Sequence, residues 1–224
     1  MAGLMSALVM CYNIIGFRLL RSGTMAMYTL FLMTGGMVLP YIWGLLFLNE
    51  DFSLLRTAGL AVILSGVILS NFSGERANIK QIVMCLAVFV LNGFVSIISK
   101  MHQSQTTFDR VNAAEFIILG GIIKFLLAGI LFLVFKNKDG SESGDNSLKK
   151  AVIIITSSAF IGGVSYMLQL LGAKSLPATV LYPFITGGSI VFSSFAGVIL
   201  FKEKLSAKLI ISVILCFAGT LMFL

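Results

Sequence analysis

One lysine, Lys124, lies near the middle of the apolar run Ala114–Phe135. If that run is a helix, Lys124 is about 15 Å from either end at about 1.5 Å per residue, too deep for its side chain to reach water easily. Its ammonium group could bind an anionic ligand group or take part in proton movement. It could equally bond the carbonyls at the ends of neighbouring helices. Gly121 and Ala128 share its helix face, so we expect neighbouring helices to approach there and Lys124 to face a central cavity.

Uncharged polar side chains form a second group of candidates, because they too lie inside apolar runs. Burying an amide without a partner costs about 1–3 kcal/mol in proteins, so such groups should face protein or water rather than lipid. Each could line a cavity or only bond a neighbouring helix. Together with Lys124, the residues predicted to bind a ligand are Asn13, Asn92, Gln169, Tyr182, Thr34 and Thr186.

Two threonines of that set begin the same tripeptide, Thr-Gly-Gly, at 34–36 and 186–188. A proline lies close to each tripeptide, Pro40 after the first and Pro183 before the second. A proline within a helix removes one backbone hydrogen bond, which frees a carbonyl near each tripeptide. Helices broken at corresponding places can form a ligand site, although packing explains the glycines more simply. We therefore interpret Gly35, Gly36, Gly187 and Gly188 as close-packing positions more than as ligand contacts.

The composition indicates which elements hold these residues. Hydrophobic residues make up 58% of the 224 residues and charged residues only 11%. Soluble domains have about 25% charged residues, so this chain could not cover a core with solvated surface, and it is an integral membrane protein. The Lys and Arg residues are scattered singly, which excludes a nucleic-acid patch. The sequence contains no metal-ligand cluster, phosphate-binding loop or catalytic Cys/His pattern, so we expect no cofactor, no metal and no enzyme activity.

Several apolar runs are long enough, or nearly long enough, to cross a membrane as helices. They predict an all-α bundle that passes through the cell membrane and its lipid bilayer many times. The polar segments between the runs, including 99–112 and 136–150, are interpreted as loops, and His102 falls in the first of them. The predicted spans are Met1–Phe17, Met25–Leu48, Thr57–Phe72, Ile82–Ile98, Ala114–Phe135, Ala151–Leu171, Pro177–Phe201 and Leu209–Leu224.

The two ends of the chain repeat a pattern. Five predicted spans separate Glu50 from Glu203, an odd number, so equivalent points face opposite sides of the membrane. Both glutamates are expected to cap turns at the membrane surface. We interpret residues 1–72 as three helices of a first repeat and residues 73–224 as five helices of an inverted second repeat. An offset of 153 pairs Gly44 with Gly197, Glu50 with Glu203, Ser53 with Ser206 and Gly66 with Gly219.

These segments resemble a known family. The stretches Leu176–Ser206 and Phe47–Gly66 are similar to EamA-type members of the drug/metabolite transporter superfamily, which have ten spans in two inverted repeats around a shared cavity. Lys124 resembles a basic residue common in the second helix of such a repeat. The resemblance implies a secondary transporter or exporter of small organic metabolites or drugs. The absent helix pair implies an alternative, a non-transporting or assembly-dependent membrane protein, with a second copy of the chain closing the open flank.

Overall fold

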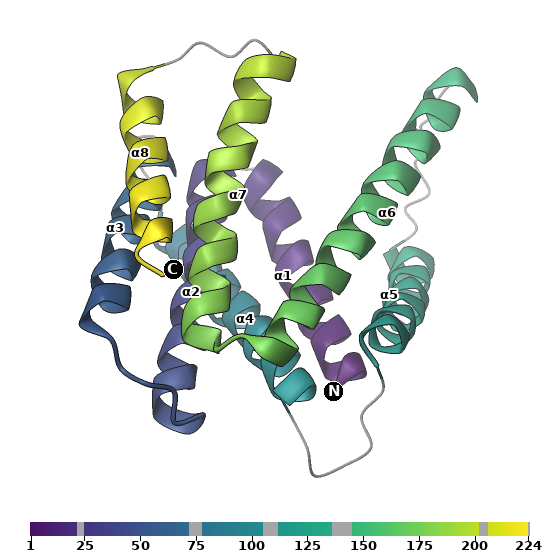
Figure 1. The fold of residues 1–224 in the computed structure, drawn as a ribbon. Helices are drawn as coiled ribbons and strands as arrows, with labels where there is room; N and C mark the ends of the chain where they lie inside the picture. Colours follow the sequence, from purple (N-terminus) through teal and green to yellow (C-terminus); the bar gives the residue numbers. More distant parts are fainter. Residues whose placement is uncertain (22–24, 72–77, 105–111, 136–144, 202–205, 224) are drawn as a thin grey trace.

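The computed structural model describes residues 1–21, 25–71, 78–104, 112–135, 145–201 and 206–223, and within these ranges it contains eight helices and no strand (Figure 1). Each predicted span coincides with one helix, so the predicted all-α, multi-pass bundle is confirmed. The helices are α1 (Ala2–Arg21), α2 (Met25–Phe47), α3 (Leu54–Asn71), α4 (Ile79–Ser104), α5 (Ala113–Phe135), α6 (Asp145–Ser175), α7 (Ala178–Phe201) and α8 (Ala207–Leu221).

Two helices extend into segments that we predicted as loops. Residues 99–104 belong to α4, and residues 145–150 belong to α6, so the loop prediction is wrong there. The end of α4 stays helical because its polar side chains are buried against other helices. His102 is one of them: its ring lies over the ring of Phe116 from α5, with 4.0 Å between the ring centroids. Tertiary contacts of this kind outweigh local polarity, which is only a weak guide to where a helix ends.

Helix length separates two kinds of element. Six helices are long and apolar enough to cross a membrane, whereas α3 and α8 are shorter apolar helices. The 15 residues of α8 extend about 22 Å at about 1.5 Å per residue, less than the hydrocarbon thickness of about 30 Å. Both short helices begin with the same cap. Ser53 Oγ accepts from the Arg56 N–H at 3.4 Å, and Ser206 Oγ accepts from the Leu209 N–H at 3.1 Å.

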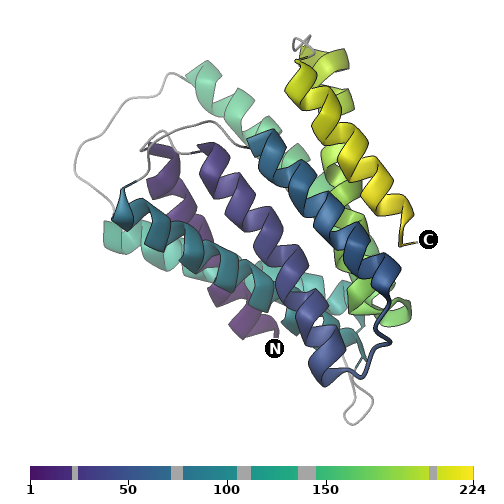
Figure 2. The same ribbon diagram turned by 90° about the vertical axis from the view of Figure 1, so that its left-hand side faces the viewer.

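The contact between α3 and α8 is reciprocal. A Cβ atom on Gly66 would lie 2.6 Å from Cys216 Sγ, and one on Gly219 would lie 2.7 Å from Ile63 Cγ1. Shifted by 153 residues, Gly66 becomes Gly219 and Ile63 becomes Cys216, so each contact is the image of the other. A two-fold axis produces this exchange. The two helices lie side by side and run in opposite directions (Figure 2), and α2 and α7 also run in opposite directions (Figure 1), as an inverted repeat requires.

The predicted division of the repeats between residues 72 and 73 falls in 72–77, outside the described residues, and it stays a prediction. Within the predicted second repeat, α4 and α5 are the two helices that have no counterpart in the first repeat. On the side of α2, the glycines pack against α4: a Cβ on Gly36 would lie 2.6 Å from Asn92 Nδ2, and Gly35 is packed against the backbone of Phe89. Close packing was the predicted role of these glycines.

The corresponding face of α7 is open. A Cβ on Gly188 would meet no atom of the described residues within 4 Å, and the side chain of Phe192 one turn later is 77% exposed. Helix α6 contacts α7 mainly near the turn that joins them and leans away from it towards its other end (Figure 1). Among the described helices, none occupies the position on α7 that α4 occupies on α2. This is the open flank that the incomplete repeat predicts.

We predict that a second copy of the chain covers this flank. With Cys11 replaced by Ser to remove an exposed thiol, Phe192→Cys should form disulfide-linked dimers when native membranes are oxidised. Ile118→Cys on the outer face of α5 is the control, because its side chain is also exposed but lies away from α7. Dimers are measured by non-reducing electrophoresis. A chain that remains monomeric, or that cross-links equally at both sites, would contradict the prediction.

Candidate functional site

A cavity of about 290 Å³ lies inside the bundle. Its walls come from α1 and α2, which we predicted to belong to the first repeat, and from α4, α6 and α7, which we predicted to belong to the second. It is more polar than its surroundings, which are mostly aliphatic. The lining residues are Tyr12, Leu32, Met33, Gly36, Asn92, Val95, Ser96, Tyr166, Gln169, Tyr182, Ile185, Thr186 and Ser189.

Three of the lining side chains keep unused hydrogen-bonding capacity. The Tyr12 hydroxyl, the Gln169 amide and the Thr186 hydroxyl make no hydrogen bond with the residues that the structure describes. None of the lining residues is Asp, Glu, Lys, Arg or His. The cavity therefore presents neutral donors and acceptors in a helical bundle whose outer surface is hydrocarbon. Groups of this kind can bind a polar molecule but have no charge with which to neutralise an ion.

Asn92 is positioned by the glycines of α2. Its Nδ2 donates to the Leu32 carbonyl at 2.7 Å, which fixes the amide across the α2–α4 contact. The approach is possible because Gly36 has no Cβ at this point. One N–H of the amide group and its Oδ1 are left to face the cavity beside Gly36.

Two tyrosines have hydroxyl groups that are already bonded to protein. Tyr182 OH donates to the Ser96 carbonyl at 2.5 Å, and Tyr166 OH lies 2.7 Å from Ser99 Oγ and 3.0 Å from Met5 Sδ. The bonds to Ser96 and Ser99 link α7 and α6 to α4, and the bond to Met5 links α6 to α1. The rings of both tyrosines are consequently held in place as walls of the cavity.

A charged clamp holds the turn between α6 and α7 at one end of the bundle. Lys100 Nζ, on α4, donates to the carbonyls of Ala173 at 3.0 Å and of Leu176 at 2.5 Å, where α6 ends. Glu50 accepts from the N–H groups of Ala178 at 2.6 Å and Thr179 at 2.8 Å, where α7 begins. A cation is stabilised by the partial negative charge at a helix C-terminus, and an anion is stabilised by the partial positive charge at a helix N-terminus.

The end of α2 directs Glu50 towards α7. Asn49 has a φ of 50°, in the left-handed region, and the Glu50 N–H donates back to the Gly44 carbonyl at 3.2 Å. A residue in the left-handed region is a common way to end a helix, and asparagine tolerates this conformation. Gly44 also leaves room for the carboxylate, because a Cβ there would lie 2.6 Å from Glu50 Oε2.

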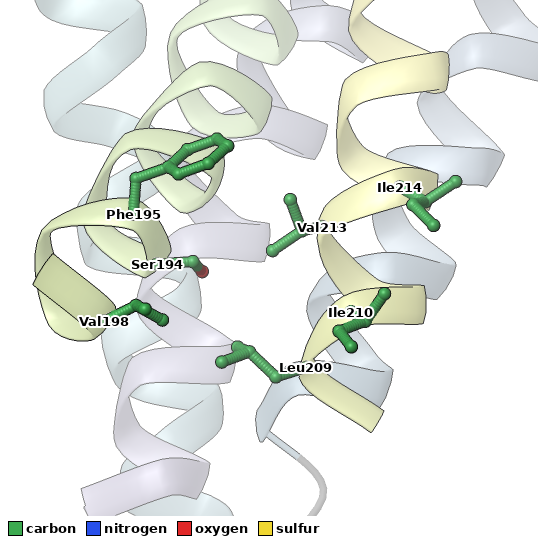
Figure 3. A pocket seen from close by; sticks show the side chains of 7 residues that line it. All are labelled: Ser194, Phe195, Val198, Leu209, Ile210, Val213 and Ile214. Atoms are coloured by element: carbon green, nitrogen blue, oxygen red, sulfur yellow. The ribbon is translucent and has the colours of Figure 1, made fainter. Parts of the chain in front are cut away.

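A second hollow, of about 260 Å³, lies between α7 and α8 (Figure 3). Its lining is hydrocarbon apart from Ser194, whose hydroxyl is the one polar side-chain group drawn there. Such a surface offers almost no specific contact to a polar ligand, so the central cavity is the candidate site. The hollow is lined by Ser194, Phe195, Val198, Leu209, Ile210, Val213 and Ile214.

The family model described as the EamA-like transporter family matches residues 79–224, which include α4 to α8. The chain belongs to the EamA-like transporter family. A solved structure titled only as the crystal structure of a protein is similar over 99% of this chain and 74% of its own, with a TM-score of 0.74 and 16% identity. At that identity the likeness shows a shared fold alone. No curated protein matches. Family membership places the chain among membrane transporters of small molecules.

Four residues predicted to bind a ligand in this EamA-like transporter line the cavity: Asn92, Gln169, Tyr182 and Thr186. The other three do not. Thr34 Oγ1 instead donates to the Leu30 carbonyl of its own helix at 2.8 Å, and Asn13 lies on α1 outside the lining. Gly187 packs against α8, because a Cβ there would lie 3.3 Å from the Cys216 carbonyl oxygen. Pro40 and Pro183 are buried within α2 and α7.

Lys124 is half-buried on α5 and is not part of the cavity lining. Our expectation that helices approach closely beside it is wrong, since Gly121 has no described atom within 4 Å of its Cβ position and Ala128 is exposed. Sequence reasoning missed Lys100, which we placed in a loop. Its one local signal is that it follows a long apolar run, and its partners lie more than 70 residues away.

Lys100→Met should lower the thermal stability of the transporter. The substitution keeps the side chain's length but leaves the Ala173 and Leu176 carbonyls without their donor, and an unpaired buried group costs roughly 1–3 kcal/mol. Lys124→Met is the matched control, because Lys124 bonds none of the described residues. Thermal unfolding of the purified variants in detergent compares the two. Equal stability of both variants would contradict the clamp.

Proposed function

We propose that this chain is a secondary transporter or exporter that moves small organic metabolites or drugs across the cell membrane through the central cavity. The observation that carries the proposal is a polar cavity between inverted repeats in an otherwise apolar bundle. Secondary transporters commonly bind their substrates at such an interface. The sequence has no phosphate-binding loop, so the proposed energy source is a gradient or exchange rather than nucleotide hydrolysis.

The arrangement of α6 and α7 supports alternating access. The clamp fixes their joined ends to α4 and to the end of α2, while α6 leans away from α7 towards its other end (Figure 1). A rocking motion about the clamped end would change the width of the cavity at the opposite end. Such rigid-body motion of one repeat against the other is the usual mechanism of these folds.

Gln169→Leu should abolish transport and leave the protein folded. The amide bonds none of the described residues, so its loss removes a ligand contact without breaking an internal bond. Ser158→Leu is the control, because it introduces the same side chain on the exposed face of the same helix. Proteoliposomes are incubated with a ¹³C-labelled cell extract, and the compounds that enter are identified by mass spectrometry. If no compound enters faster than into protein-free liposomes, or if Gln169→Leu transports normally, the proposal fails.

A second candidate is a subunit that transports only within an assembly. The open face around Gly188 favours it, because both glycines at the corresponding place on α2 are packed against α4. In that case uptake should rise more steeply than linearly with protein density in the liposomes, as dimers form. Uptake that is proportional to density would favour the single chain as the working unit.

A further inference from the structure

We infer that the cavity selects small, planar, uncharged molecules that carry a hydrogen-bond donor and an acceptor side by side. Aromatic carboxamides, lactams and nucleobases have this chemistry. The inference rests on the proposed function, since it names the class of substrate for the same cavity. It follows from three features of the lining: the absence of charge, the unused amide groups and the aromatic walls.

The first feature is charge. None of the lining residues carries a charged side chain, and the two charged groups of the clamp are already bonded to the ends of α6 and α7. An ion that enters a site of low dielectric constant without a counter-charge loses hydration that the site does not replace. A neutral molecule avoids this loss. The lining therefore disfavours anions and cations alike.

The second feature is the pair of primary amides. Gln169 has its whole amide free of bonds to the described residues, and Asn92 has one N–H and its Oδ1 left after bonding Leu32. An amide presents a donor and an acceptor about the same distance apart as those on a carboxamide or a base edge, and it can bind both at once. The Tyr12 and Thr186 hydroxyls add adaptable partners, because each can donate or accept.

The third feature is the shape of the walls. Tyr12, Tyr166 and Tyr182 line the cavity, and bonds to α4 or its neighbours hold the last two rings. Aromatic rings stack on flat ligands and add about 1–3 kcal/mol per stacked base in nucleic-acid sites. The volume of about 290 Å³ is at the small end of ligand pockets, which suits a ligand of one or two rings.

Three probes of nearly equal size separate charge from shape. Nicotinamide is neutral with an adjacent donor and acceptor, nicotinate replaces the amide with a carboxylate, and 1-methylnicotinamide adds a fixed positive charge. Ligand-induced thermal stabilisation of the purified full chain in detergent reports binding without requiring transport. We expect nicotinamide to bind at least about tenfold more tightly than either ion. Tighter or equal binding of either ion, or no binding of nicotinamide at millimolar concentration, overturns the inference.

Two variants assign the binding to the cavity. Thr186→Val is nearly isosteric and should weaken nicotinamide binding, because it removes a hydroxyl that bonds none of the described residues. Gln169→Glu should reverse the preference, so that 1-methylnicotinamide becomes the tightest of the three probes. Unchanged binding in both variants would show that nicotinamide binds elsewhere and would overturn the inference. Because these measurements do not involve uptake, their failure leaves the transport proposal to the labelled-extract assay, and the failure of that assay leaves the binding result intact.

Discussion

The turn between α6 and α7 depends on two charged side chains, the buried Lys100 and the half-buried Glu50. Helix ends expose carbonyl and N–H groups, and away from water these groups need partners. Lys100 supplies donors to the end of α6, and Glu50 supplies acceptors to the beginning of α7. Each charge is stabilised by the helix end it caps, so neither stands alone in the bundle. Because the partners come from α4 and from the end of α2, the clamp also sets where α6 and α7 meet the remaining helices, and the cavity walls follow from that placement.

Two-fold symmetry and its incompleteness explain the rest of the architecture. The short helices α3 and α8 satisfy the symmetry through reciprocal glycine contacts, exchanging the roles of Gly66 and Gly219. Helices α4 and α5 have no such mates among the described helices. As a result α4 packs into the glycine face of α2 and brings Asn92 to the cavity, while the equivalent face of α7 at Gly188 stays open. The cavity is therefore enclosed by α4 on one side, and on the other side it adjoins the exposed face of α7.

Much of this could be predicted from the sequence, because the strongest signals are local. Apolar runs gave the helices, and the recurring Ser, Glu and Gly residues gave the inverted repeat. The cost of an amide in lipid correctly pointed to Asn92 and Gln169 as inward-facing residues. For charged side chains, the energetic cost of burial in lipid was a misleading guide. It favoured Lys124, which is half-buried outside the cavity lining, over Lys100, whose carbonyl partners become neighbours only when the chain folds. Depth within a run shows that a lysine needs explanation but not which surface it faces.

Transport by this protein requires water and small solutes to enter the central cavity. The most direct measurement is the rate at which a small, uncharged, water-soluble thiol reagent modifies a cysteine placed there, with Cys11 replaced by Ser. Thr186→Cys should react rapidly, because its thiol would be hydrated and could ionise. Ile122→Cys, exposed on the outer face of α5, should react much more slowly in membranes, because hydrocarbon surrounds it. Equal rates at the two positions, or a folded Thr186→Cys protein that does not react, would show that water and small solutes do not enter the cavity.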